Sequence, residues 1–300
     1  MQECLYVHPD NVRVARKELA LRAAVIARPD WVLSQSQVRQ LIVETERGVH
    51  TRCYVTRQGD VSYMIVYGRF NRKRGTSADI DFELTQEAVS MLGIPTIVGT
   101  FSVGSVRGDD RAGRIYIPHD MIGYGNFNRT RNRQSGFRNV DMLLPFCPRT
   151  RAVLVKAASA CEFAVEMRGV YASFHGYPRY ETLAELEMYG RQGVDVVGQT
   201  LDVEATLARE AGCHYAAVVA TIDDHEIRSR FLANDKTASV EIDRHILNGR
   251  RRTFEVFLSA LPGLAADEYV SCNCVRQGER AKERNDLFYY RPAHLCEDES

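Results

Sequence analysis

Three short polar segments contain the residues best suited to acid–base chemistry and to binding a polar ligand. They are Tyr180-Glu181, Gln199-Thr200 and Asp223-Asp224. A carboxyl group in a partly dry pocket has a raised pKa, so it can hold or donate a proton at neutral pH. We therefore take these six residues as candidate members of a single ligand site, with the two aspartates as candidate catalytic acids.

The segments between these residues predict the elements that would bring them together. Apolar residues recur at helical spacing over residues 183–189 and 203–211. Short apolar runs at 194–197 and 215–220 are typical of strands that are buried on both faces. Alternating strands and helices predict a mainly parallel sheet with helices on both sides. In such sheets ligands bind just beyond the carboxyl ends of the strands, which is where the polar segments are expected to lie.

The rest of the chain predicts further elements of the same sheet. Gln58-Gly59-Asp60 predicts a turn between two strands, and Pro262-Gly263 predicts the end of a long helix. We expect one α/β domain over residues 1–265, with a central mixed, largely parallel sheet flanked by helices, and a charged extension over 266–300. The other expected elements are strands at 4–8, 41–56, 61–67, 94–99 and 114–119 and helices at 14–28, 83–92 and 243–261.

The composition gives no indication of a nucleic-acid or membrane partner. The 300 residues include 39 basic and 39 acidic side chains, so the formal net charge is zero and no overall field attracts polyanions. No apolar run approaches the ~20 residues that cross a bilayer, and the amino terminus lacks the features of a secretory signal. The scattered cysteines are typical of core residues in a reducing compartment. We therefore expect a cytoplasmic protein. Because the net charge is zero, we interpret the arginines of residues 123–138 as part of a solvated or interface loop.

Cys272 and Cys274 are separated by a single residue, which is a weak indication of redox or metal chemistry. Two thiols near the end of a strand are the simpler interpretation of this spacing. From the sequence we therefore expect no metal ligands in this chain.

The central part of the chain carries a series of motifs: Leu144–Arg151, Pro178–Glu185, Gly193–Thr200, Glu204 and Ala208–Gly212. In this order they resemble the trimeric purine nucleoside phosphorylase and methylthioadenosine phosphorylase family, over about residues 100–264. The resemblance implies a homotrimer that cleaves the N-glycosidic bond of a purine nucleoside. It also implies inorganic phosphate as the co-substrate, without any other cofactor.

The resemblance assigns roles to the polar segments. Glu181 corresponds to a glutamate that hydrogen-bonds the purine, and Tyr180 replaces a phenylalanine that stacks on the base. Gln199 stands where a methionine packs under the ribose, and Thr200 keeps a phosphate-binding hydroxyl. One aspartate of the pair after the last strand corresponds to the acid that contacts N7 of the base. Capping of the following helix is the alternative role for these aspartates.

The phosphate-binding motifs depart most from the family pattern. Arg69 corresponds to a phosphate-binding arginine, with a solvent-facing position as the alternative, and Ser102 lies in a loop that holds phosphate and sugar. Phe101 stands where a second hydroxyl is expected. The segment from His8 to Asn11 replaces a glycine-rich loop, a type of loop that binds anions through converging N–H groups. The sequence therefore predicts weaker phosphate binding than the family norm.

Three functions are compatible with these patterns. The first is a purine nucleoside phosphorylase of the methylthioadenosine type. The second is a phosphate-independent nucleosidase, or an enzyme acting on a modified nucleoside, which the changed phosphate loops favour. The third is a catalytically degenerate binding or assembly subunit, because a fold does not fix a function. We rank the three in this order.

Overall fold

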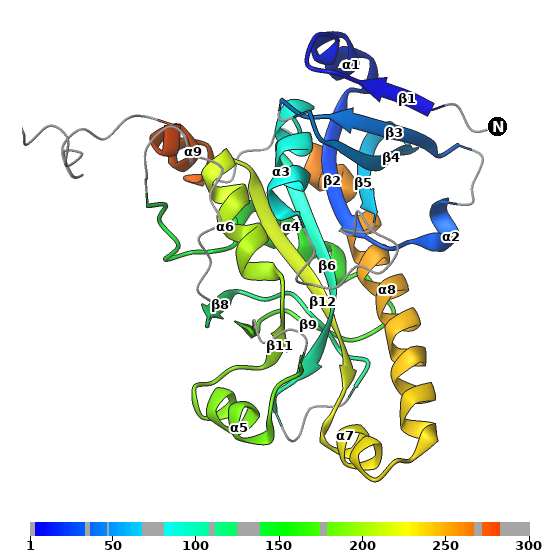
Figure 1. Cartoon of the computed structure of the whole chain (residues 1–300), viewed down its shortest axis with the longest axis vertical. Helices are drawn as coiled ribbons and strands as arrows, with labels where there is room; N and C mark the ends of the chain where they lie inside the picture. Colours follow the sequence, from blue (N-terminus) through cyan, green and yellow to red (C-terminus); the bar gives the residue numbers. More distant parts are fainter. Residues whose placement is uncertain are drawn as a thin grey trace, which may run out of the picture.

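The computed structural model describes residues 4–33, 37–46, 48–67, 81–107, 112–124, 139–174, 179–266 and 272–282. Within these residues the chain forms a twelve-stranded mixed sheet with helices on both sides (Figure 1). The predicted α/β architecture with a mixed, mostly parallel sheet is confirmed. The candidate phosphate ligand Arg69 lies outside the described residues, as does most of the arginine-rich loop at 123–138.

Two long parallel strands, β6 (Thr96–Ser105) and β12 (His214–Asp223), form the centre of the sheet. β2 (Leu21–Ala27) lies parallel to β6 on its other side, and β5 (Val61–Tyr67) lies parallel to β2. Most side chains of β2, β5 and β12 are buried, as expected for parallel strands that are covered on both faces. The carboxyl ends of β2, β6 and β12 therefore point in the same direction.

The sheet continues on both sides of this centre. Beyond β5, the order is β4 (His50–Gln58), β3 (Arg39–Glu44) and the edge strand β1 (Cys4–Val7). β4 runs antiparallel to both of its neighbours, and β1 runs parallel to β3. The short strands on the other side are β11 (Val196–Gly198), β10 (Val170–Ser173), β8 (Asp120–Gly123), β7 (Ile115–Tyr116) and β9 (Val165–Glu166).

Two helix pairs cover the centre of the sheet. The long helix α8 (Lys236–Ala265) packs on β12, β6 and β2 beside α4 (Pro148–Ala158), whereas α6 (Leu201–Ala211) packs on β12 beside α3 (Phe82–Met91). Figure 1 shows α8 running along the sheet opposite α6. The other helices of the described residues are α1 (Val12–Leu19), α2 (Asp30–Leu33), α5 (Leu183–Arg191), α7 (His225–Leu232) and α9 (Cys274–Lys282).

Side chains of β12 show that the two helix pairs lie on opposite faces. The Tyr215 hydroxyl donates to the Glu204 carboxylate of α6 at 3.0 Å. Ala220 instead faces Gly249 of α8, where an added Cβ would lie 2.6 Å from the alanine Cβ. Because side chains alternate along a strand, these odd and even positions point to opposite faces. Gly249 is therefore the point of close contact between α8 and the sheet.

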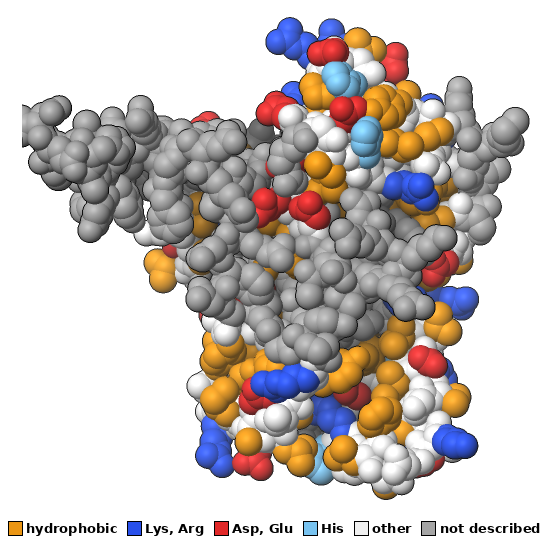
Figure 2. All heavy atoms as spheres, viewed as in Figure 1, with side chains coloured by type: hydrophobic (Ala, Val, Ile, Leu, Met, Phe, Trp, Pro, Cys, Tyr) orange, Lys and Arg blue, Asp and Glu red, His pale blue; other side chains and the backbone are white. Residues whose placement is uncertain are grey.

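The surface of the described residues is mixed in charge. On the face in Figure 2, basic and acidic side chains are interspersed, and the described residues form no continuous basic patch there. None of the helices in the described ranges combines the length and the apolar composition that crossing a membrane requires.

The predicted helix over residues 14–28 is wrong in its second half. α1 ends at Leu19 because Ala20 takes a left-handed conformation, with φ at 44°, that closes the helix. The following residues form β2, which is apolar except for Arg22 and is buried in the middle of the sheet. A continuous apolar run of this length does not distinguish a buried strand from a helix by its periodicity.

The predicted strand at 41–56 is two strands, β3 and β4, joined by a tight turn. The Thr45 N–H donates to the Val49 carbonyl at 2.9 Å, and Gly48 supplies the positive φ of 69° that the turn needs. The predicted strand at 114–119 is correct in place but forms over only two residues.

Two predictions near the carboxyl end also need correction. Pro262 lies inside α8, which ends at Ala265. The proline removes a single N–H within the last turn, and its own carbonyl still accepts from the Ala266 N–H at 3.1 Å, so the helix continues for one more turn. Cys274 is the first residue of α9, so this pair of cysteines leads into a helix, and its thiols lie beside His214 at the start of β12.

Candidate functional site

A pocket of about 370 Å³ opens at the carboxyl ends of β2, β6 and β12. Its walls come from β6, from the residues after β2 and β11, from the end of β12, from the segment before α5 and from α8. This is the place where ligands bind in α/β sheets. The volume is that of a small-molecule site.

Six of the eight predicted site residues line this pocket: Ser102, Tyr180, Glu181, Gln199, Thr200 and Asp223. They come from β6, from the segment before α5, from the start of α6 and from the end of β12. Asp224 is not among the lining residues, and Arg69 lies outside the described part of the chain.

Hydrogen bonds at the start of α5 fix the segment that carries Tyr180 and Glu181. The Thr182 hydroxyl accepts from the Glu185 N–H at 3.2 Å, and the Glu185 carboxylate accepts from the Thr182 N–H at 2.7 Å. The Arg179 guanidinium donates to both oxygens of the same carboxylate, each at 2.8 Å. The chain is therefore held on both sides of Tyr180 and Glu181.

The two glutamates of this segment have opposite pKa shifts. Burial raises the pKa of Glu181, and the negative charge of Asp223 raises it further. Hydrogen bonds from Arg179 lower the pKa of Glu185 to about 2. Glu181 therefore keeps its proton to a higher pH than an ordinary glutamate does, whereas Glu185 is a permanent anion at neutral pH.

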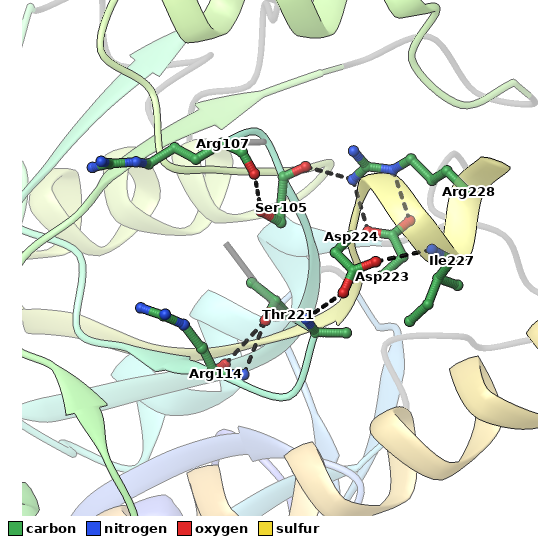
Figure 3. Close-up of polar contacts among 9 residues, drawn as sticks. Ser105, Arg107, Arg114, Thr221, Asp223, Asp224, Ile227 and Arg228 are labelled. Carbon is green, nitrogen blue, oxygen red and sulfur yellow. Dashed lines mark hydrogen bonds and ion pairs between the residues drawn. The ribbon is translucent and has the colours of Figure 1, made fainter. Parts of the chain in front are cut away.

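Asp223 reaches the pocket through an irregularity of β12. The pairing of β12 with β6 shifts between Thr221 and Asp223, which places Asp223 opposite Gly104. Arg228 of α7 holds this carboxylate at both oxygens, with Nη2–Oδ1 at 2.7 Å and Nε–Oδ2 at 3.2 Å (Figure 3). Arg228 also donates to the Ser105 carbonyl at 2.5 Å. One charge-assisted pair thus joins α7 to the ends of β12 and β6.

Asp224 has a structural position instead. It is the N-cap of α7, and its carboxylate accepts from the Ile227 N–H at 2.9 Å and from the Ala112 N–H at 3.1 Å. Figure 3 shows that Asp223 and Asp224 have different partners although they are adjacent in the chain. Asp224 corresponds to the capping role that the sequence left open.

Gln199 and Thr200 lie at the start of α6. Gly198 leaves room for the Tyr171 hydroxyl of β10, because a Cβ at residue 198 would lie 2.5 Å from it, and this hydroxyl accepts from the Thr200 N–H at 3.3 Å. A helix start attracts anions, but the first turn of α6 already contains two buried carboxylates, Asp202 and Glu204. These two carboxylates already place negative charge at the positive end of the α6 dipole, which makes this helix start less attractive to a bound anion.

Two arginines that the sequence analysis did not identify also line the pocket. Arg28 follows β2, and Arg250 comes from α8. Arg250 Nη1 lies 4.0 Å from an oxygen of Asp30, so the α8 arginine reaches the segment that follows β2. The apolar run of β2, followed by Arg28 and Pro29, is the sequence pattern that could have predicted a buried strand ending at the pocket.

The acidic and basic residues lie toward different ends of the pocket. Asp223 pairs with Gly104 near the end of β6. The Thr100 hydroxyl, earlier on β6, donates at 2.8 Å to the carbonyl of Ile26, two residues before Arg28. Four residues of strand separate Thr100 from Gly104, which corresponds to about 13 Å. Asp223 therefore ends the strand on one side of β6, whereas Arg28 follows the strand on the other side, whose pairing with β6 ends at Gly99.

Phe101 partly fills the pocket where a second hydroxyl was expected. Its half-buried side chain lines the cavity. A Cβ on Gly99 would lie 2.4 Å from the Phe101 ring, so the ring packs directly over this glycine. Ser102 is exposed at the pocket and is the hydroxyl that this part of β6 offers to a ligand.

The segment from His8 to Asn11 does not take the place of the phosphate loop, and this prediction is wrong. It follows β1, which pairs only with β3 at the edge of the sheet among the described residues. Of β1 and β2, only β2 leads into the pocket. Because β2 was predicted as part of a helix, the phosphate loop was expected after β1 instead of after β2.

The fold and the pocket together define an α/β protein with a polar ligand site at the carboxyl ends of a mixed sheet. A family model of the phosphorylase superfamily matches residues 32–259, which is more than half of the chain. The protein therefore belongs to the phosphorylase superfamily.

Curated relatives within this superfamily are distant. A purine nucleoside phosphorylase of Drosophila pseudoobscura pseudoobscura is 34% identical over 150 residues, which cover 47% of this chain and 50% of that protein. The match thus spans half the length of that relative. An S-methyl-5′-thioadenosine phosphorylase of Thermococcus kodakarensis is 29% identical over 191 residues, which cover 62% of this chain and 70% of the relative.

Solved structures agree with the fold. A mutant adenosine/methylthioadenosine phosphorylase from Schistosoma mansoni, in complex with methylthioadenosine, matches with a TM-score of 0.72. The match covers 89% of this chain and all of that one at 21% identity. A methylthioadenosine phosphorylase from an antarctic soil metagenomic library matches with a TM-score of 0.70 at 21% identity, over 91% of this chain and 94% of that one. At this identity the likeness establishes the fold alone.

Proposed function

We propose that this protein is a purine nucleoside phosphorylase, of the type that acts on methylthioadenosine-like nucleosides with phosphate as co-substrate. The main support is a pocket of about 370 Å³ that combines the carboxyl groups of Glu181 and Asp223 with the guanidinium groups of Arg28 and Arg250. A purine fits the end with the carboxyl groups, and phosphate fits the end with the guanidinium groups. The sugar then lies between them, where the bond is broken.

At the acidic end, Tyr180 stacks on the base and Glu181 binds it. The purine leaves as an anion unless N7 receives a proton or a hydrogen bond, so a carboxyl group there acts as a general acid. The raised pKa of Glu181 favours it as the proton donor. Both oxygens of Asp223 accept from Arg228, which favours Asp223 as an acceptor for the base. This assignment replaces the sequence-based proposal that an aspartate supplies the proton.

At the basic end, Arg28 and Arg250 are the proposed phosphate ligands, with Ser102 and Thr200 as hydroxyl donors. A guanidinium matches the geometry of phosphate oxygens. The bound phosphate attacks C1′ of the sugar while its negative charge stabilises the oxocarbenium-like transition state. Gln199, which lines the same pocket, is the proposed contact to the ribose. The predicted contact from Arg69 remains a proposal.

A phosphate-independent nucleosidase is the second candidate. The half-buried Phe101 ring favours it, because this ring takes the place of a hydroxyl that would hold phosphate. In that case water attacks C1′, and the product is the free sugar instead of the sugar 1-phosphate.

The test is release of free base from adenosine, inosine and methylthioadenosine, each with and without phosphate. We expect base release that requires phosphate, with a sugar 1-phosphate as the second product. Equal rates without phosphate, together with free sugar, would establish the nucleosidase instead. No turnover of any of the three substrates would favour the non-catalytic subunit.

We also propose a homotrimer, because of the family resemblance in the sequence. Sedimentation at micromolar protein concentration measures this directly. Trimers are expected, and a monomer at all concentrations would remove this part of the proposal.

A further inference from the structure

A cluster of three cysteines and one histidine lies at the opposite end of β12 from the pocket. Its members are Cys147, His214, Cys272 and Cys274, and their ligand atoms all lie within 4.8 Å of one another. His214 is the first residue of β12, whereas Asp223 is its last. Nine residues of strand separate them, about 30 Å. The cluster is therefore independent of the proposed catalytic site.

Each member of the cluster is fixed by an element of the fold. Cys147 is the N-cap of α4, and its N–H donates to the Tyr215 carbonyl at 2.7 Å. The His214 N–H donates to the Pro95 carbonyl at 2.8 Å. The thiols of Cys272 and Cys274 come from the segment that begins α9. Three parts of the chain that are distant in sequence thus converge on one point.

The cluster is mostly shielded from water. Cys147 and Cys274 are each 1% exposed, and His214 is 8% exposed. None of the three cysteines forms a disulfide in the structure. Three thiols and an imidazole that converge on one point form a set of sulfur and nitrogen ligands suited to a metal such as zinc.

The distances within the cluster fit tetrahedral coordination. His214 Nδ1 lies 3.5 Å from the Sγ of Cys147 and 3.3 Å from the Sγ of Cys272. For a tetrahedral zinc ion with Zn–S near 2.3 Å and Zn–N near 2.0–2.1 Å, the expected N···S separation is about 3.5 Å. The observed separations are close to this value. They leave room for an ion at the centre, with the imidazole bound through Nδ1.

We propose that these four residues bind one Zn²⁺ ion in a closed Cys3His structural site. Four protein ligands complete the tetrahedron, so no position remains for water or a substrate. The ion displaces the protons of the three thiols and leaves a net charge of −1 on the site. The buried Arg209 guanidinium of α6 lies close enough to Cys274 to interact with its charge and offset this negative charge.

The ion fastens α9 to the body of the protein. α9 packs on the end of α6 so closely that a Cβ on Gly278 would lie 2.3 Å from the Gly212 nitrogen. This contact buries little apolar side chain because both residues are glycines. Metal bonds from Cys272 and Cys274 add a second attachment of α9 to the body of the protein.

The first experiment measures zinc in the full-length protein, purified under reducing conditions without chelators. We expect one zinc per chain by plasma mass spectrometry. The double substitution Cys272→Ser with Cys274→Ser is expected to abolish stoichiometric zinc. Cys161→Ser, which changes a half-buried cysteine outside the cluster, is the matched control and is expected to keep it.

The second experiment uses Co²⁺ in place of zinc and keeps the proposal testable if the double variant does not fold. The wild-type protein is expected to give the thiolate-to-cobalt charge transfer and the intense ligand-field bands of a tetrahedral site. A strong chelator should lower Tm of the wild type and of Cys161→Ser, because the ion binds only the folded state. Zinc far below one per chain after reconstitution with excess Zn²⁺ would overturn the proposal. A Cys272–Cys274 disulfide in anaerobically purified protein would overturn it as well.

Discussion

The acidic end of the pocket and its basic end are assembled from different kinds of sequence. Glu181 lies just before α5 and Asp223 is the last residue of β12, and each lies within a motif or directly after a predicted strand. Arg28 and Arg250 come from opposite ends of the chain, one after β2 and the other from the middle of α8. The acidic end could therefore be predicted from sequence, whereas the basic end required the folded chain.

The two ends also differ in how their charges are controlled. At the acidic end, the Arg228 guanidinium donates hydrogen bonds to both carboxylate oxygens of Asp223. Burial raises the pKa of Glu181. At the basic end, Arg28 is exposed and Arg250 is half-buried near Asp30. We infer that the acidic end controls proton transfer to the leaving base, and that the basic end controls the affinity for phosphate. Substitutions at the two ends should therefore affect different kinetic constants.

The largest expected effect is on turnover at the acidic end. Glu181→Gln keeps the size of the side chain but removes the proton, so kcat should fall by about 10² to 10⁴. The measurement is steady-state release of the base from the best substrate. Asp224→Asn is the matched control, because this carboxylate caps α7 and does not line the pocket. Wild-type turnover in Glu181→Gln would remove Glu181 from the mechanism.

Substitutions at the basic end should raise KM for phosphate and change kcat less. Arg28→Gln and Arg250→Gln each remove a charge-assisted hydrogen bond, which corresponds to a loss of about tenfold to a hundredfold in phosphate affinity. KM for the nucleoside should change little. Arg191→Gln, on the exposed surface of α5, is the control for a general loss of positive charge. An unchanged KM for phosphate in both pocket variants would separate the basic end from phosphate binding.

The comparison of the adjacent aspartates predicts a smaller effect, on stability. Asp224→Ala leaves two backbone N–H groups, those of Ile227 and Ala112, without their acceptor. Loss of an N-cap lowers the free energy of unfolding by about 1 kcal/mol. Urea unfolding checks this value. A large loss of turnover in Asp224→Ala with unchanged stability would instead return Asp224 to the pocket chemistry.

The smallest expected effect is the pH dependence that Glu181 adds to stability. Its pKa is higher in the folded protein than in the unfolded chain. Between the ordinary value and the raised value, the folded state binds more protons, so stability falls as pH rises through this window. Glu181→Gln has no such titrating carboxyl group, so its stability should not fall in this window. The variant should therefore be more stable than the wild type at neutral pH. Urea unfolding at about pH 4 and about pH 7 measures the difference, and an equal difference at both pH values would contradict it.

The sequence by itself determined the fold class, the helices α3, α5, α6 and α8, and six of the residues that line the pocket. These follow from local patterns, such as helical spacing over residues 183–189 and buried apolar runs at 194–197 and 215–220. The position of the polar segments after strands also placed Glu181 and Asp223 correctly at the pocket, because parallel strands carry their ligand sites at the same end.

Tertiary structure decided what depends on contacts between distant segments. Periodicity did not identify β2, because a strand buried on both faces does not alternate. The place of Arg28 at the end of this strand was therefore not evident from the sequence. Only the packing of α8 on the sheet at Gly249 brings Arg250 to the pocket. The roles of Asp223 and Asp224 likewise depend on Arg228 and on the start of α7. The convergence of His214 with three thiols has the same origin, since it joins the start of a strand, the start of α4 and the segment before α9.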